Sequence, residues 1–137
     1  MPKNLRLTRD QLAAINARRG PNKFGARKKM VDGITFDSTH EAEVYIGLKL
    51  RQQAGEIRNL QCHVPIRVHV NEQHVFSYEC DFVYEEGSYV VPGGKAAPRW
   101  RSAWADAKGY KKGAAYQLFR LKKAVIKAAL GIEIEEV

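Results

Sequence analysis

Two strand-like stretches, Ile57 to Val70 and His74 to Tyr84, are separated by only three residues. The linking segment, Asn71-Glu72-Gln73, is polar and has the length of a hairpin loop, so the stretches are expected to pair as antiparallel strands. Pro65 in the first stretch indicates an edge position or a break, because proline cannot donate a hydrogen bond to a sheet. Any fold of this chain therefore has to accommodate a long antiparallel pair.

Helical and strand patterns alternate around this pair. Met30 to Phe36 contains Asp32-Gly33, a dipeptide that favours a tight hairpin turn. Ser38 stands three residues before Glu41, as in a capping box, and predicts the start of a largely buried helix that ends at Gly55. The other predicted elements are a helix from Thr8 to Arg19, a turn at Glu85-Glu86-Gly87, a strand from Ser88 to Val91, an irregular stretch from Pro92 to Pro98, a strand from Arg99 to Lys108, a helix from Ala114 to Leu130 and a last strand from Ile132 to Val137.

The length of 137 residues suits one domain. We therefore predict a single α/β domain, residues 30–137, with a central mixed sheet flanked by helices. An N-terminal helix and a basic arm, residues 1–29, are expected to precede it.

Alternation along two predicted strands brings acidic residues to defined faces. Between Phe76 and Tyr84, the strand period of two places every aromatic side chain on one side and Asp81 on the other. Between Trp100 and Tyr110, the same count places Asp106 and Lys108 on one face, opposite three alanines. Two acids and a lysine are thus presented by strands whose other faces are apolar.

If these strands are neighbours, roughly 4.8 Å apart, Asp81 and Asp106 can bring two carboxylates to one Mg²⁺, a hard cation that prefers oxygen ligands. The metal would polarise a phosphoryl oxygen and lower the pKa of an attacking water. Lys108 can place its ammonium near that water or near the developing negative charge. The alternative is that both acids form surface ion pairs, which contribute little stability. The pattern favours metal-dependent hydrolysis of a phosphodiester.

The order of these motifs resembles a known superfamily. Asp81 followed by Asp106-Ala107-Lys108 is similar to the pattern of the PD-(D/E)xK nucleases. The runs KFGARKKMVDGITFDSTHEAEVYIGLKL, GEIRNLQ, YECDFVY and ADAKGY resemble a family of small phage and prophage endonuclease-like proteins, over residues 22–137. Two departures are that Cys80 replaces the proline of the superfamily name and that Ala105 stands where relatives often carry an acid. The resemblance implies a restriction-endonuclease-like core and a Mg²⁺-dependent DNA endonuclease in which Mn²⁺ can substitute.

The same resemblance implies roles for further residues. Glu41 would join Asp81 and Asp106 as a metal ligand and catalytic residue, and Gln61 would support the site. A purely capping role for Glu41 remains open, and Glu43 is an alternative acid, although its helical neighbours indicate another face. Junction-resolving relatives often act as dimers, so the resemblance also implies homodimerisation and the processing of branched DNA, such as Holliday junctions, in phage DNA recombination.

An excess of basic residues indicates a polyanionic partner. Lys and Arg outnumber Asp and Glu by 23 to 15, which gives a formal charge of +8. The residues expected to contact phosphates are Lys111 and Lys112, then Tyr116, Arg120, Lys123 and Lys127 on one face of the predicted C-terminal helix, and Arg27, Lys28 and Lys29 in the basic arm. The alternative for each group is an ordinary solvated surface.

The remaining composition indicates neither a membrane protein nor a thiolate metal centre. No apolar run approaches the length of a membrane span, and the N-terminus does not resemble a signal peptide. Cys62 and Cys80 do not form a CxxC pair, and His63 and His69 are interpreted as strand residues rather than ligands. The chain is expected in the cytoplasm of a bacterial or phage-infected cell.

The sequence therefore predicts a Mg²⁺-dependent endonuclease. The competing hypothesis is a non-catalytic nucleic-acid-binding module that keeps the nuclease fold, and a third is an RNA-binding structural protein. Because a binding module has no chemical need for Asp81, Asp106 and Lys108 together, their presence favours the enzyme.

Overall fold

A computed structural model describes residues 27–88 and 99–137. The predicted helix from Thr8 to Arg19, the residues 89–91 of a predicted strand and the stretch from Pro92 to Pro98 lie outside the described residues. The chain divides into two compact units, residues 1–39 and 40–137.

The first unit contains the short hairpin predicted around Asp32-Gly33. Strands β1 (Lys29–Val31) and β2 (Ile34–Phe36) pair antiparallel, with Val31 opposite Ile34. The two turn residues have φ values of 52° and 76°. A two-residue turn of this kind requires positive φ at both positions, which explains the Asp-Gly dipeptide.

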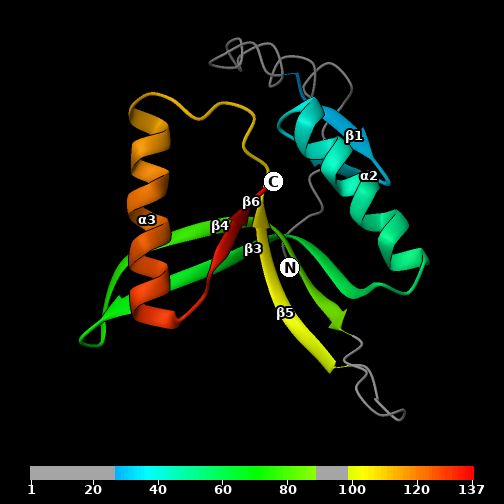
Figure 1. Ribbon diagram of the computed structural model, residues 1–137. Helices are drawn as coiled ribbons and strands as arrows, with labels where there is room; N and C mark the ends of the chain where they lie inside the picture. Colours follow the sequence, from blue (N-terminus) through cyan, green and yellow to red (C-terminus); the bar gives the residue numbers. More distant parts are fainter. Residues whose placement is uncertain (1–26, 89–98) are drawn as a thin grey trace, which may run out of the picture. The chain divides into compact units, whose positions relative to one another are not determined.

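The second unit contains a four-stranded mixed sheet and two helices (Figure 1), as predicted. Its elements are α2 (Thr39–Gln53), β3 (Ile57–Val70), β4 (Gln73–Ser88), β5 (Arg99–Asp106), α3 (Ala114–Leu130) and β6 (Ile134–Glu136). The strand order is β3-β4-β5-β6, in which the first two pairings are antiparallel and the last is parallel. None of the helices in the described residues is long and apolar enough to cross a membrane.

The central hairpin is confirmed, but its details differ from the prediction. Its turn has two residues rather than three, because Asn71 and Glu72 both adopt positive φ, 50° and 64°, and Gln73 already belongs to β4. Strand β4 continues through the turn predicted at residues 85–87, where Gly87 lies opposite Trp100. A Cβ on Gly87 would meet the Trp100 ring at 3.2 Å, so glycine here makes room for an aromatic ring rather than for a turn.

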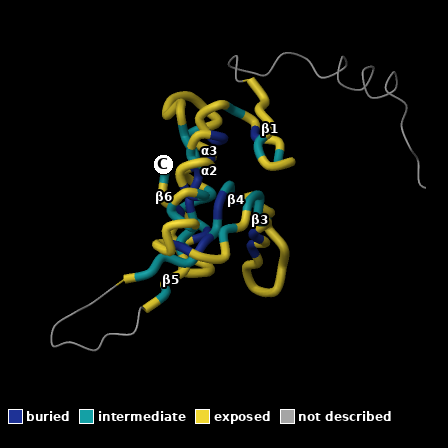
Figure 2. The backbone as a smooth tube through the Cα atoms, turned by 90° about the vertical axis from the view of Figure 1, so that its right-hand side faces the viewer, coloured by how far each residue is buried: buried dark blue, intermediate teal, exposed yellow. Residues whose placement is uncertain are grey.

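Helix α3 forms where predicted but buries a different face. Apolar residues recur at helical spacing in this stretch of the sequence, at Ala114, Leu118, Leu121, Val125 and Ala128, which predicted that this face would be buried. Leu118 and Leu121 are instead 52% and 61% exposed, whereas the helix buries Phe119 and Ile126. These two pack with Ile66, Val68, Cys80 and Ile134 of the sheet in a cluster that we call the α3 core. Figure 2 shows buried positions along the strands and exposed ones over the helix surfaces.

Helix α2 is less buried than predicted. It buries one stripe, Glu41, Ala42, Tyr45 and Leu48, while Ile46 and Leu50 are exposed. Its last turn is joined to the sheet by Gln52 Oε1, which accepts a hydrogen bond from the Leu60 N–H at 2.9 Å, and by Arg51, which donates to Glu86 at 2.6 Å.

The alternation predicted for β4 does not persist along the whole strand. Cys80 belongs to the α3 core, and Phe76 and Tyr78 pack against it, as one face of a strand should. Val83 then packs against this core, while Phe82 and Tyr84 are buried outside it. The side of the sheet that faces α3 therefore changes from even to odd positions between Cys80 and Val83, and Asp81 lies at this change.

Candidate active site

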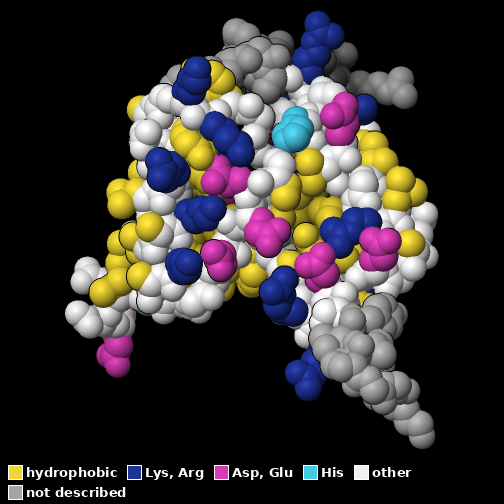
Figure 3. Space-filling model, in the orientation of Figure 1, with side chains coloured by type: hydrophobic (Ala, Val, Ile, Leu, Met, Phe, Trp, Pro, Cys, Tyr) yellow, Lys and Arg dark blue, Asp and Glu magenta, His cyan; other side chains and the backbone are white. Residues whose placement is uncertain are grey.

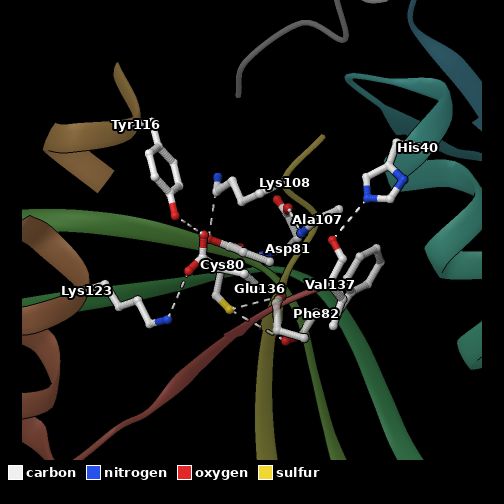
Figure 4. A network of polar contacts seen from close by, with 12 residues as sticks. His40, Cys80, Asp81, Phe82, Ala107, Lys108, Tyr116, Lys123, Glu136 and Val137 are labelled. Atoms are coloured by element: carbon white, nitrogen blue, oxygen red, sulfur yellow. Dashed lines mark hydrogen bonds and ion pairs between the residues drawn. The ribbon is translucent and has the colours of Figure 1, made fainter. Parts of the chain in front are cut away.

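Asp81 on β4 and Asp106 at the end of β5 lie opposite each other. The register pairs Phe82 with Ala105, so the two strands are neighbours as the sequence predicted. Asp106 Oδ1 accepts a hydrogen bond from the Asp81 N–H at 2.8 Å, and Asp81 Oδ2 accepts one from the Ala107 N–H at 3.0 Å. Each carboxylate therefore fixes backbone of the other's segment, and Figure 4 shows Asp81, Ala107 and Lys108 within this polar network.

Asp106 is fully buried and incompletely satisfied. Its Oδ2 atom has no hydrogen-bond partner among the described residues, and Lys108 Nζ lies 3.7 Å away, too far for a hydrogen bond. Burial raises the pKa of Asp106, although the bond from the Asp81 N–H and the charge of Lys108 act to lower it. Because a buried carboxylate oxygen without a donor is costly, this atom is a place where added positive charge would be stabilising.

A third carboxylate comes from α2. Glu41 is 6% exposed, and its Oε1 atom lies 2.9 Å from His63 Nε2 on β3. Burial acts to lower the pKa of His63, but the bond to Glu41 and its negative charge raise it overall. Burial and the charge of Glu41 also raise the pKa of Asp81 to about 6, although Ala107, Lys108 and His63 act to lower it. Glu41, Asp81 and Asp106 therefore form one group of interacting acids.

The sequence predicted a strand that includes Lys108, but β5 ends at Asp106 and Lys108 lies just beyond it. Its backbone N–H donates to the Val137 carbonyl at 3.1 Å, which holds the segment after Asp106 against the end of β6. The ammonium is 3.7 Å from Asp106 Oδ2 and 4.2 Å from the centre of the Phe119 ring. The predicted set of Asp81, Asp106 and Lys108 is therefore brought together.

His63 is a member of this site that sequence reasoning missed, because it was interpreted as an ordinary strand residue. Its φ of 53° lies in the left-handed region, which is uncommon for a residue other than glycine. The pairs Val64–Cys80 and Cys62–Phe82 flank it, so His63 lies across from Asp81. Counting back along the hairpin from its turn brings His63 within one residue of Asp81, and the register shift between Val68 and His69 supplies the remaining residue.

The family resemblance had also implied a supporting role for Gln61. The structure places it on β3, exposed and opposite Val83. Its neighbour Cys62 has a pKa raised by burial to about 11, so it carries a protonated thiol and is a poor nucleophile or ligand. Within residues 27–88 and 99–137, no three His, Cys, Asp or Glu side chains are arranged as a ready metal centre.

The acidic strand β6 lies between the site and the basic face of α3. Glu136 is paired with Asp106 in the sheet, and its carboxylate accepts hydrogen bonds from Tyr116 at 2.7 Å and from Lys123 at 3.4 Å. Lys127 donates to Glu133 at 3.3 Å. Three of the four helix residues predicted to contact phosphate are thus engaged with carboxylates of this chain.

Other predicted phosphate contacts are exposed. Arg120 on α3, and Lys111 and Lys112 ahead of it, are solvent-exposed. Figure 3 shows Lys and Arg side chains gathered over α3, with acidic side chains beside them. In the other unit, Arg27, Lys28 and Lys29 are exposed, and Lys28 Nζ lies 4.0 Å from Asp37.

The fold and the site define an α/β protein with an acidic pair and a lysine where the end of β5 lies against the middle of β4. The chain belongs to the family described as "Protein of unknown function (DUF1064)", which matches residues 21–92. The match includes Glu41, His63 and Asp81 and ends before Asp106 and Lys108. No curated protein and no solved structure matches the chain.

Proposed function

We propose that this protein is a Mg²⁺-dependent endonuclease that hydrolyses phosphodiester bonds in DNA. The observation that supports it most directly is the buried Asp106 Oδ2 atom, which has no hydrogen-bond donor and lies beside the ammonium of Lys108. Protein interiors rarely keep such an atom without a functional reason. The neighbouring Asp81, with its pKa raised to about 6, is the kind of perturbed group that clusters at active sites.

The site residues fit a divalent cation by their chemistry. Three carboxylates that repel one another in a partly buried place are stabilised by a hard cation with oxygen ligands. Asp81 and Asp106 would hold it, and Glu41 would join them by exchanging its contact with His63. When bound, Mg²⁺ would supply charge that polarises a phosphoryl oxygen and acidifies a water. Mn²⁺ has similar ligand preferences and is expected to substitute.

Each residue of the site then has a definite role. Asp81 and Asp106 set their own orientation through the reciprocal bonds to backbone N–H groups, so little reorganisation is needed for binding. Lys108 supplies an ammonium beside Asp106, where it can stabilise negative charge that develops on the phosphate. Exposed Lys111, Lys112 and Arg120 provide phosphate contacts along the substrate.

Contacts of this kind recognise the backbone and shape of DNA rather than its bases. We therefore expect structure-selective cutting, with branched DNA such as a Holliday junction as the preferred substrate, in phage DNA recombination. Action by a homodimer, in the cytoplasm of a bacterial or phage-infected cell, completes the proposal.

The first experiment measures cleavage of four-way-junction, duplex and single-stranded DNA with Mg²⁺, Mn²⁺ or EDTA. Asp106→Asn and Lys108→Ala should each lower the rate by about 10²-fold or more. Lys122→Ala is a matched control, because Lys122 also lies over a phenylalanine ring, that of Phe76, and bonds to none of the site acids in the structure as described. Equal rates for Lys108→Ala and Lys122→Ala would refute the role of Lys108.

A second candidate, a non-catalytic nucleic-acid-binding module, is favoured by one observation. The acids already have structural partners, namely the backbone bonds of Asp81 and Asp106 and the contact between Glu41 and His63. Salt-sensitive binding of DNA without cleavage under any metal condition would establish this module, and metal-independent preference for folded RNA would establish an RNA-binding protein.

A further inference from the structure

Lys108 is the most mobile type of side chain in the site, yet it is held from two sides. A lysine side chain has four rotatable methylenes and loses considerable entropy when it is fixed. Its distance of 3.7 Å to Asp106 Oδ2 leaves the ion pair without a hydrogen bond to set its direction. The second contact is the face of Phe119, whose centre lies 4.2 Å from Nζ, well within the range of a cation–π interaction.

Phe119 is itself held rigidly. It is 6% exposed and belongs to the α3 core together with Val68 and Cys80. The rings of Tyr78 and Tyr116 both pack near it, with centroids 6.0 Å and 6.1 Å away. Such separations are typical of stabilising aromatic pairs, so the ring that faces Lys108 has little freedom to move.

From these contacts we infer that Phe119 is a positioning residue, which uses its ring face to hold the Lys108 ammonium beside Asp106. The family match covers residues 21–92 and ends before α3. The inference rests on the proposed nuclease activity for its catalytic consequence, but the positioning itself can be measured without any substrate.

Phe119→Leu removes the ring and retains an apolar side chain in the core. Phe76→Leu is the matched control, because Phe76 packs against the same core and its ring faces the ammonium of Lys122 instead of that of Lys108. In nuclear magnetic resonance spectra of the protein alone, the Lys108 ε-methylene protons should show an upfield ring-current shift. This shift should vanish in Phe119→Leu and persist in Phe76→Leu and Phe119→Tyr. A Lys108 signal that is unchanged by Phe119→Leu would overturn the inference, whether or not the protein cuts DNA.

The catalytic consequence has its own test. A cation–π contact of ordinary strength corresponds to a fall in kcat of about 3- to 30-fold in Phe119→Leu, with KM unchanged and with Phe119→Tyr restoring the rate. If Phe119 acts through Lys108, adding Phe119→Leu to Lys108→Ala should cause no further loss. Fully multiplicative losses would reject that route. A wild-type protein that fails to cut any DNA would instead refute the proposed function and leave the resonance measurement to decide the positioning.

Discussion

The carboxylate of Asp106 accepts a hydrogen bond from the backbone N–H of Asp81, at 2.8 Å, across the β4–β5 ladder. Asp81 returns the interaction one residue further along, at the Ala107 N–H. The acids proposed to bind metal are thus also part of the hydrogen bonding that ends the ladder. A substitution that tests the chemistry of these acids should keep the oxygen that accepts the backbone hydrogen bond, so asparagine is a better choice than alanine.

Asp106→Asn should lose cleavage and gain stability. The amide keeps an oxygen for the Asp81 N–H and removes the buried charge whose pKa is raised by burial. We expect the free energy of unfolding at pH 7 to rise by roughly 1 kcal/mol. Urea unfolding followed by circular dichroism measures this change. Asp37→Asn, at an 85% exposed side chain, is the control and should shift stability by less than about 0.5 kcal/mol. A less stable Asp106→Asn protein would mean that the charge is structural.

Stability should fall as the pH rises through the titration of Asp81. Burial and the charge of Glu41 raise its folded-state pKa from 3.8 to about 6, so the folded state holds the proton more tightly. The stabilising contribution is complete below about pH 4 and is lost by about pH 6, with a maximum size of about 3 kcal/mol. The difference in unfolding free energy between wild type and Asp81→Asn isolates this term. A difference that is constant between pH 4 and pH 7 would exclude the raised pKa.

The basic residues should differ in their contribution to DNA affinity. Lys123 and Lys127 already interact with Glu136 and Glu133, so replacing them with alanine should change the number of counterions released on DNA binding only slightly. Alanine at the exposed Lys111 and Lys112 should lower the slope of log affinity against log salt by about 2. Fluorescence anisotropy over a range of salt concentrations measures both double variants. The opposite ranking would mean that DNA displaces the carboxylates of β6.

Two glycines should respond oppositely to alanine. A Cβ on Gly87 would press on the Trp100 ring at 3.2 Å, and Arg58 stacks on that ring at 4.3 Å, so Gly87→Ala should cost about 1 kcal/mol. A Cβ on Gly47, in α2, meets nothing within 4 Å, so Gly47→Ala should stabilise by about 0.5 to 1 kcal/mol. Thermal denaturation of the two variants provides the comparison, and destabilisation by both would contradict it.

The hairpins and the two helices follow from local rules, and so do the strand faces of Asp81 and Asp106, whereas the pairing of β4 with β5 that brings the two acids together was an assumption. The dipeptide Asp32-Gly33 favours a two-residue hairpin turn, and the strand period places an acid on a defined face. The failures came from tertiary contacts. Gly87 resembled a turn because a sequence does not show that Trp100 will cover it, and the burial of Phe119 over Leu118 depends on which helix face meets the sheet.

The change from even to odd positions on the α3 side of β4, which we call the phase change, could not be predicted for the same reason. A strict period of two assumes one buried side, whereas this strand serves the α3 core up to Cys80 and another buried region from Phe82. The left-handed conformation of His63, across from Asp81, could not be predicted from its being a histidine. The pair formed by Glu41 and His63 therefore emerged only from the folded arrangement.

That phase change has a further consequence for how the molecule fluctuates. Asp81 lies at the point where β4 passes from the α3 core to the region joined to α2, and its neighbours Glu41 and Lys108 are held by one helix each. Local opening of either helix would disturb the same acid. A cation bound there should slow amide hydrogen exchange both in the first turn of α2 and around Phe119 of α3, although the two segments belong to different helices.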